Sequence, residues 1–377
     1  MTVLFIFITA IYVIFICVLY IAYGKVETFK WRPKNPVSRF SIVVPFRNEA
    51  NHLDTLLQSF KDLNYPKELF EIIMIDDDSE DHSVDIIQSF LRKYQQEKLN
   101  ITILKNERQS HSPKKDAIVS AISHSNFEWI VTTDADCVIP EFWLQSFDII
   151  IQHKAPKLIV APVGYGISNS NLEYFQLHDF LSLQSATVGG FGIGNPFLCN
   201  GANLCYKKDI FKELNGFKGN TNIASGDDLF FMEKVVKNYP KDIHFLKSKN
   251  AIVYTKPEAT LMALFNQRVR WASKTSAYNN LFSKVLALIV LLMNASLVLC
   301  FVLAILGLQS WQFLSILFII KFCFDFLFIF RSSNFFNQNF SLIRYPLNSL
   351  MYPLFVVAVS CYSMFFNYKW KGRSFKK

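Results

Sequence analysis

The chain has 377 residues, of which 51% are hydrophobic and 16% aromatic, and its formal net charge is +9. The basic residues cluster beside long apolar segments, so this charge suits an anionic membrane surface and argues against nucleic acid as a partner. The seven cysteines form no Cys-x-x-Cys pair, so neither a disulfide framework nor a zinc site is indicated.

The chain begins with an uncharged apolar segment, residues 2–23. It is long enough to cross a bilayer, which takes roughly 20 residues. A cleaved signal peptide is the alternative, but its basic start and small-residue cleavage site are not visible. We therefore expect a membrane helix over residues 1–24, followed by a domain of mixed polar and apolar composition over residues 25–280.

Apolar strands alternate with amphipathic helices in the first half of this domain. The alternation indicates right-handed βαβ units, and hence an α/β fold with a parallel sheet. In such sheets ligands bind at the carboxyl ends of the strands. The expected strands are residues 40–46, 70–76, 100–106 and 129–136, and the expected helices are residues 47–63, 83–94 and 114–125.

Acidic side chains follow three of these strands. Glu49 follows the first strand, Asp76 and Asp77 close the second, and Asp134 and Asp136 close the fourth. Carboxylates gathered at one sheet edge repel one another unless a cation lies between them, so we expect a site rather than solvated turns. The Asp-Ala-Asp pair suits Mg²⁺ or Mn²⁺ bound through carboxylates and substrate phosphates, although such a triplet alone is a weak signal.

Two further motifs lie later in the domain. Asp227 and Asp228 open an expected amphipathic helix, where one aspartate can be an N-cap and a carboxylate can act as a general base. Gln267, Arg270 and Trp271 form a Q-x-x-R-W pattern just before the C-terminal apolar segments. A basic helix at the membrane interface would carry the same residue types.

The C-terminal part of the chain is again apolar. We expect a membrane region of two or three helices over residues 281–366 and a basic tail over residues 367–377. The positive-inside rule places both the 25–280 domain and the tail in the cytoplasm, which conflicts with three full crossings. The prolines of the last segment make it a candidate hairpin or re-entrant piece. The apolar segments are residues 285–308, 312–330 and 346–366.

Two smaller features each have two interpretations. Lys321 and Asp325 lie four residues apart inside an apolar segment, either as a mutually neutralising pair or as a contact for a polar part of a lipid acceptor. The glycine-rich segment 189–194 either allows an acceptor to approach the backbone closely or is a flexible loop.

The motifs PFRNEA, DDDSED, TTDAD, GDD and QRVRW, in this order, resemble those of the membrane-bound glycosyltransferases of family 2. These include the synthases of cellulose, chitin, hyaluronan and poly-N-acetylglucosamine. The resemblance covers about residues 38–275 and the flanking apolar segments. It implies a GT-A fold, a nucleotide-sugar donor such as a UDP-sugar, and inversion at the anomeric carbon.

The resemblance also implies a role for each motif. Metal binding, to Mg²⁺ or Mn²⁺, falls to Asp134 and Asp136. Catalysis falls to Asp227 and Asp228, with Asp228 as the base. Contacts with the diphosphate and the acceptor fall to Gln267, Arg270 and Trp271. Donor binding falls to Pro45, Glu49, Asp76, Asp77, Lys115 and Asp134.

The chain departs from the family pattern at two places. Asp227-Asp228 stands where Glu-Asp is usual, which keeps the base. Lys114-Lys115 stands where Gly-Lys is common, which weakens the donor-pocket role of Lys115.

The expected activity is transfer of a sugar from a nucleotide sugar to a lipid-linked or growing saccharide acceptor. It would take place at the cytoplasmic face of the cell membrane, in a multi-pass protein in contact with membrane lipids. A nucleotidyltransferase, which would release pyrophosphate, and a non-catalytic membrane scaffold are the alternatives.

Overall fold

The computed structural model describes residues 1–29, 34–166, 169–223, 225–366, 368–370 and 373–375. The side chains of the expected basic tail, residues 367–377, lie outside this description. The chain forms two compact units. We call residues 27–166 and 198–256 the sheet unit, and residues 1–26, 167–197 and 257–377 the helical unit.

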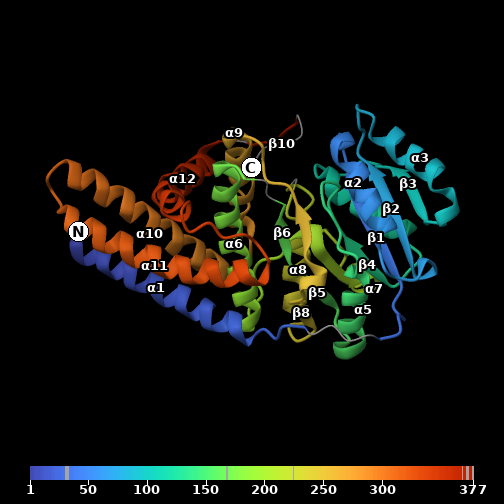
Figure 1. Ribbon diagram of the computed structural model, residues 1–377, viewed down its shortest axis with the longest axis horizontal. Coiled ribbons are helices and arrows are strands. Elements are labelled where there is room, and N and C mark those ends of the chain that lie inside the picture. Colours follow the sequence, from blue (N-terminus) through green and yellow to red (C-terminus); the bar gives the residue numbers. More distant parts are fainter. Residues whose placement is uncertain (30–33, 167–168, 224, 367, 371–372, 376–377) are drawn as a thin grey trace. The chain divides into compact units, whose positions relative to one another are not determined.

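In the part of the sheet unit that the structure describes, seven strands form one sheet in the order β3-β2-β1-β4-β7-β5-β8 (Figure 1). Strands β3, β2, β1 and β4 run parallel, as expected, whereas β7 runs antiparallel between β4 and β5. The sheet is therefore mixed rather than parallel throughout. The strands are β1 (Phe40–Phe46), β2 (Phe70–Asp76), β3 (Ile101–Lys105), β4 (Trp129–Thr132), β5 (Leu158–Val160), β7 (Leu204–Lys207) and β8 (Ile243–Phe245).

Continuous apolar runs explain the central strands, because parallel strands covered on both faces carry few polar residues. Strands β1 and β2 are buried along almost their whole length. A short parallel pair, β6 (Val163–Tyr165) with β9 (Val253–Thr255), completes the unit. Its helices are α2 (Ala50–Lys61), α3 (Ser83–Lys93), α4 (Pro113–His124), α5 (Trp143–Lys154), α7 (Lys208–Glu213) and α8 (Asp227–Asn238).

The fourth strand is shorter than expected. It ends at Thr132 rather than at Asp136, because the chain turns over residues 134–137, where the Cys137 N–H donates to the carbonyl of Asp134. This turn takes the Asp134 and Asp136 carboxylates out of the strand.

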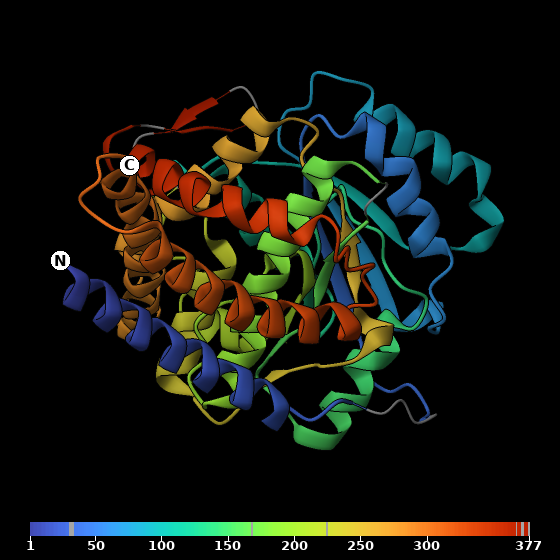
Figure 2. The ribbon, with the colours of Figure 1, turned by 60° about the vertical axis from the view of Figure 1, so that its left-hand side comes forward.

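Among its described residues, the helical unit contains four helices that are long and apolar enough to cross a membrane. Helices α10 and α11 both pack on α1, and Figures 1 and 2 show the three running alongside one another. Helix α12 is continuous through Pro353, so the hairpin interpretation of this segment is wrong. The elements are α1 (Thr2–Lys25), α6 (Asn171–Gly192), α9 (Leu261–Ala272), α10 (Leu281–Ile305), α11 (Trp311–Phe335), α12 (Tyr345–Phe365), β10 (Tyr368–Trp370) and β11 (Arg373–Phe375).

Short 3₁₀ turns connect several of these elements. They are η1 (Lys67–Leu69), η2 (Gln95–Glu97), η3 (Gly201–Asn203), η4 (Lys249–Ala251) and η5 (Thr275–Ala277).

The glycine-rich segment is part of a helix contact. A Cβ atom on Gly192 would lie 1.9 Å from the carbonyl oxygen of Ala22, and one on Gly189 would lie 2.9 Å from that of Leu19. Small residues let two helix backbones approach closely in this way. Gly189 and Gly192 therefore serve the packing of α6 on α1, and the flexible-loop interpretation is wrong for them.

Lys321 and Asp325, within α11, neutralise each other. Lys321 Nζ lies 2.5 Å from Asp325 Oδ2. The hydroxyl of Tyr12, on α1, donates to Asp325 Oδ1 at 2.5 Å, so the pair also ties α1 to α11.

Candidate active site

The sheet brings the acidic segments to one edge. β1 pairs in parallel with both β2 and β4, with Phe46 opposite Asp76 and Val43 opposite Thr132. The carboxyl ends of these three strands therefore lie along the same edge of the sheet. Glu49, Asp77 and Asp134 all follow strand ends at this edge.

The end of β2 holds Asp77 through cationic and amide groups. Asp77 is buried, and its Oδ1 accepts hydrogen bonds from Asn106 Nδ2 at 2.8 Å and from Arg108 Nε at 3.0 Å. Arg47 donates to the Asp77 carbonyl at 2.8 Å, while Asp76 Oδ1 accepts from the backbone N–H of Ser79. Asn106 and Arg108 come from the segment after β3, and the sequence motifs did not single them out.

Pro45 and Glu49 lie where β1 passes into α2. Pro45 is half-buried in β1 opposite Ile75, and Glu49 is the N-cap residue of α2. The Glu49 N–H donates to Ser83 Oγ at 2.8 Å, which fixes this turn against the start of α3.

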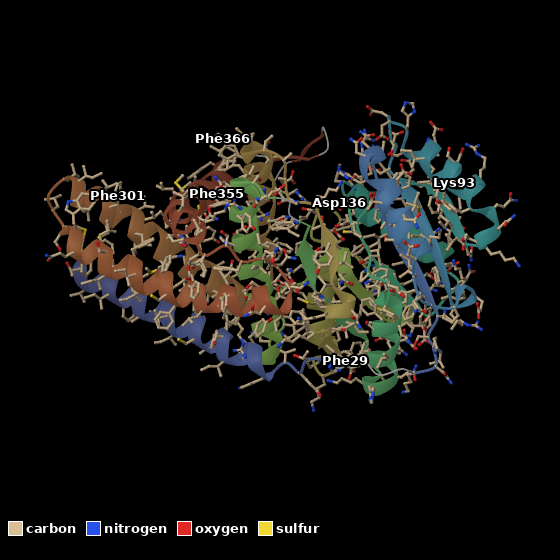
Figure 3. The ribbon with its side chains drawn as sticks, in the orientation of Figure 1. Phe29, Lys93, Asp136, Phe301, Phe355 and Phe366 are labelled. Atoms are coloured by element: carbon tan, nitrogen blue, oxygen red, sulfur yellow. The ribbon has the colours of Figure 1, made fainter. Side chains whose placement is uncertain are left out.

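A lysine joins the two aspartate motifs. Lys114 Nζ lies 2.7 Å from Asp134 Oδ1 and 3.7 Å from Asp227 Oδ2. Burial alone would lower the pKa of the Lys114 ammonium, but the Asp134 and Asp227 carboxylates outweigh it and raise that pKa above its ordinary value. Asp136 Oδ2 accepts a hydrogen bond from Thr255 Oγ1, on β9, at 3.0 Å. Figure 3 labels Asp136 among the side chains of the sheet unit.

Asp227 and Asp228 form the first turn of α8. Gly226, with a φ of 81°, is the N-cap, so neither aspartate takes that position. Asp228 Oδ2 accepts from the Gly201 N–H at 2.8 Å, and its Oδ1 accepts from the Leu229 N–H at 2.8 Å. The Gly201 carbonyl in turn accepts from Thr132 Oγ1, the last residue of β4, at 2.7 Å. This chain of contacts sets Asp228 at the same strand end as Asp134.

Lys115 points to the loop that precedes α8. It is 1% exposed, and its Nζ donates to the carbonyls of Asn220 at 2.6 Å and Ile223 at 2.8 Å. Lys115 Nζ also lies 4.9 Å from the ring centroid of Phe230. Burial lowers the pKa of the Lys115 ammonium to about 8. Lys115 thus braces this loop, and Lys114 is the lysine that contacts the carboxylates.

The Q-x-x-R-W residues lie on α9, in the helical unit. Gln267 Nε2 donates to Glu258 Oε1 at 2.8 Å, and Arg270 and Trp271 are half-buried. Arg268, which the motif passes over, lies with its guanidinium carbon 4.2 Å from the Trp271 ring centroid.

The carboxylates of Asp134 and Asp136 suit a divalent ion that also binds a substrate phosphate. Within the part of the chain that the structure describes, no three His, Cys, Asp or Glu side chains converge to hold a metal. Asp134 and Asp136 nevertheless offer carboxylate oxygens, which Mg²⁺ and Mn²⁺ prefer. Mg²⁺ is commonly bound by one or two carboxylates, with water and substrate phosphate completing its shell.

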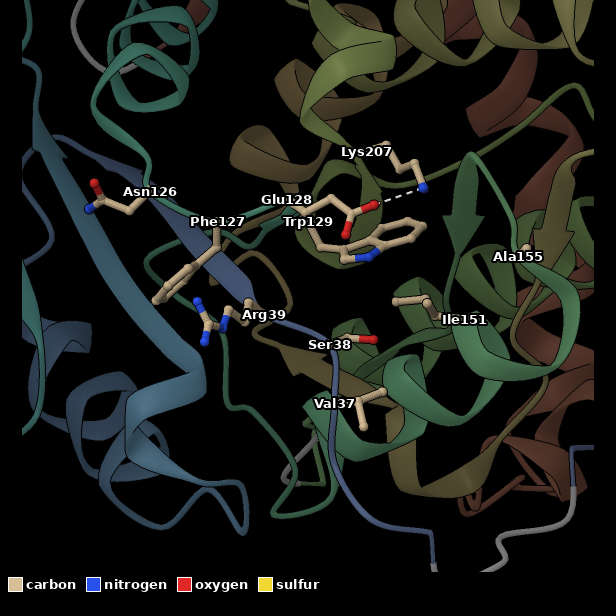
Figure 4. A pocket seen from close by; sticks show the side chains of 10 residues that line it. All are labelled: Val37, Ser38, Arg39, Asn126, Phe127, Glu128, Trp129, Ile151, Ala155 and Lys207. Atoms are coloured by element: carbon tan, nitrogen blue, oxygen red, sulfur yellow. Dashed lines mark ion pairs between the residues drawn. The ribbon is translucent and has the colours of Figure 1, made fainter.

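A cavity of about 470 Å³ lies at the opposite edge of the sheet, at the amino ends of β1 and β4 (Figure 4). Its lining includes Arg39, Trp129 and Lys207. Lys207 Nζ pairs with Glu128 Oε1 at 2.7 Å, so these two charges neutralise each other. The cavity is separate from the aspartate cluster.

Comparison with known proteins agrees with this architecture. The probable glycosyltransferase YdaM of Bacillus subtilis (strain 168) is 26% identical over 251 residues, which are 64% of this chain and 57% of YdaM. The poly-β-1,6-N-acetyl-D-glucosamine synthase of Staphylococcus epidermidis is 23% identical over 251 residues, which are 63% of this chain and 54% of that protein. The matches thus span little more than half the length of these relatives.

One solved structure shows the same fold. The mannosyltransferase PcManGT of Pyrobaculum calidifontis, in complex with GDP-Man and Mn²⁺, has a TM-score of 0.59 and 15% identity. The match covers 97% of this chain and 99% of that one. The predicted GT-A type of α/β fold is confirmed.

Two family models match the chain. Glycosyl transferase family 2 matches residues 41–214, and glycosyl transferase family group 2 matches residues 129–367, which is more than half of the chain. The resemblance seen in the motifs is confirmed, as is the predicted class of glycosyltransferase. The chain belongs to glycosyl transferase family group 2.

Proposed function

We propose that this protein is a metal-dependent, inverting glycosyltransferase that moves a sugar from a UDP-sugar to a lipid-linked or growing saccharide acceptor. The observation that carries the proposal is the meeting of Asp134 and Asp227 at Lys114, beside Asp228, at the carboxyl edge of the sheet. In a chain of this family, that cluster supplies groups for both the leaving diphosphate and the attacking hydroxyl.

The donor's nucleoside is assigned to the ends of β1 and β2. Pro45, Glu49 and Asp77 would line it, with Asp76 shaping the turn through its bond to the Ser79 N–H. Asp77 is held by Asn106 and Arg108, so its carboxylate is fixed before a ligand arrives. The PcManGT complex with GDP-Man supports a nucleotide sugar as the donor class.

Asp228 is assigned as the general base. The N–H groups of Gly201 and Leu229 each bind one of its oxygens, which fixes the orientation of the carboxylate. It would take the proton from the acceptor hydroxyl as that oxygen attacks the anomeric carbon opposite the leaving diphosphate. Asp227, beside it, is buried and turned toward Lys114.

Mg²⁺ or Mn²⁺ held by Asp134 and Asp136 would supply charge neutralisation for the leaving diphosphate. The hydrogen bond from Thr255 orients Asp136 for this role. The Mn²⁺ bound by PcManGT supports the choice of ion. Gln267, Arg270 and Trp271 keep the diphosphate and acceptor roles that the family resemblance implies. Lys115 supports the donor site through the loop before α8.

The proposed setting is a cell membrane, with residues 25–280 as the cytoplasmic catalytic domain and residues 367–377 as a cytoplasmic tail. Residues 1–24 would be the anchor and residues 281–366 the C-terminal membrane region. A cytoplasmic tail requires an even number of crossings after the catalytic domain. An 18-residue window of helix α12 has a mean hydropathy of 1.4, against 2.4–2.9 for such windows in the other three long helices. Helix α12 also packs on the amphipathic α9 through Val359 and Val269. We assign α12 to the interface rather than to a full crossing.

The test is turnover of a panel of nucleotide sugars by the purified full-length chain in detergent, with Mn²⁺, Mg²⁺ or EDTA. We expect nucleoside diphosphate release that needs the metal, and at least a 100-fold loss in Asp228→Asn and Asp136→Asn. Asp85→Asn, an exposed change on α3, is the matched control and should keep full activity. Pyrophosphate as the product would favour a nucleotidyltransferase, and donor binding without turnover would favour a scaffold. Full activity in Asp228→Asn would refute the assignment of the base.

A further inference from the structure

Lys114 is a cation built into the acidic cluster. Its side chain is 20% exposed, and it lies against the half-buried Asp134 on one side and the buried Asp227 on the other. Asp134 follows β4, whereas Asp227 opens α8, nearly a hundred residues later in the chain. A single ammonium group therefore links the two acidic motifs.

This position has a direct electrostatic consequence. Carboxylates that share a site repel one another, and a cation within about 4 Å of each relieves the repulsion. Lys114 lies within this distance of both Asp134 and Asp227. It also binds Asp134 Oδ1, one of the two oxygens that this carboxylate offers to a divalent ion.

We propose that Lys114 is a resident counter-ion of the donor site that competes with the divalent metal for Asp134. The inference rests on the proposed function, because it concerns the metal that this function requires. In the metal-free protein Lys114 holds Asp134 to Asp227, and metal binding displaces it from Asp134. The freed ammonium then remains beside the site as a second positive charge for a diphosphate.

Two measurable effects follow. Removing the ammonium should tighten the binding of Mn²⁺, because the ion then no longer competes with the Lys114 ammonium for Asp134. It should also weaken the binding of UDP in EDTA, because the remaining positive charge near the phosphates is lost.

In the experiment, Mn²⁺ alone is titrated into the full-length chain, and electron paramagnetic resonance measures the concentration of free Mn²⁺. Lys114→Met and Lys114→Gln remove the charge, and Lys114→Arg keeps it. Lys237→Met, an exposed change in the last turn of α8, controls for the lower net charge. We expect Mn²⁺ to bind at least tenfold tighter to Lys114→Met and Lys114→Gln, and within threefold of the wild type for Lys114→Arg and Lys237→Met. In EDTA, UDP should bind at least fivefold more weakly to the two neutral variants.

The inference is overturned if both neutral variants bind Mn²⁺ within twofold of the wild type, or if Lys237→Met shifts the affinity as much as they do. Thermal unfolding of each variant identifies any that fails to fold. If one of the two neutral variants misfolds, the other can still be compared with the wild type. Mn²⁺ affinity that follows Lys114 without turnover of any nucleotide sugar would uphold this inference and refute the proposed function. Metal-dependent transfer with equal Mn²⁺ affinity in all variants would support the proposed function and refute this inference.

Discussion

The carboxylate of Asp179, on α6, lies 2.5 Å from Nε of Arg268, on α9, and both side chains are buried. The hydroxyl of Tyr352, on α12, donates to the other oxygen of Asp179 at 2.9 Å. One carboxylate therefore ties three helices together. Arg268 also bonds to the Gln267 side chain and stacks on Trp271, so this tie fixes the helix that carries the Q-x-x-R-W residues.

Asp179→Asn should therefore destabilise the helical unit strongly. Removing one partner of a buried ion pair leaves an uncompensated charge and is expected to lower the free energy of unfolding by about 3–5 kcal/mol. The double variant Asp179→Asn with Arg268→Gln should lose less, because it leaves no buried charge. Thermal unfolding in detergent measures both, with Asp85→Asn as an exposed control. Equal losses in the single and double variants would contradict this account.

Lys115 should make stability depend on pH above neutrality. Its pKa is about 8 in the folded chain, compared with an ordinary value of 10.5. Between these values the unfolded chain keeps a proton that the folded chain has released, so this group's contribution to stability rises as the pH rises from 8 to 10.5. The unfolding free energy of the wild type minus that of Lys115→Met should therefore increase with pH over that range. A difference that stays constant from pH 7 to 10 would refute the lowered pKa.

The secondary structure could be predicted where burial of apolar side chains alone determines the residue pattern. Strands β1 and β2 have the expected bounds because continuous apolar runs leave no other place for those side chains. The fourth strand was drawn too long, since the turn that frees Asp134 and Asp136 depends on backbone bonds that the pattern does not show. The antiparallel β7 was missed because its four residues carry no legible periodicity.

The candidate site was predictable in its acidic residues and less so in its cations. Motif order and strand ends indicated that Asp134, Asp227 and Asp228 belong to one cluster. In the sequence, Lys114 stands out only as a departure from the family's Gly-Lys pair. Its contacts with Asp134 and Asp227 depend on the folded geometry, which the residue pattern does not give. Arg268 had no local signal, since its partner Asp179 lies 89 residues away.

Gly201 should control the position of the proposed base. Its N–H holds Asp228 Oδ2, and a Cβ atom there would lie 3.3 Å from Asp227 Oδ2 and 3.4 Å from Asp228 Cβ. Gly201→Ala should push these carboxylates by a few tenths of an ångström. Because small misplacements of reacting groups slow catalysis, we expect kcat to fall about tenfold with Mn²⁺ affinity within threefold of the wild type. Unchanged kcat would show that Asp228 tolerates the shift or does not act as the base.

The tail should be accessible from the cytoplasm. If α12 lies at the interface and only α10 and α11 cross after the catalytic domain, an epitope added after Lys377 shares the side of residues 25–280. Protease treatment of sealed right-side-out vesicles should then spare both the epitope and the catalytic domain, and detergent should expose both. Removal of the epitope from intact vesicles would mean that α12 crosses fully.

The contact between α1 and α6 leaves no room for a side chain at Gly192. A Cβ atom there would overlap the Ala22 carbonyl at 1.9 Å, and a backbone atom cannot move aside as the end of a flexible side chain can. Gly192→Ala must therefore separate the two helices, and the free energy of unfolding should fall by about 1–3 kcal/mol or more. Gly166→Ala makes the same chemical change where the nearest atom is 3.9 Å away, so it should alter the unfolding temperature far less. Similar unfolding temperatures for the two variants in detergent would show that α1 does not pack on α6 at backbone distance.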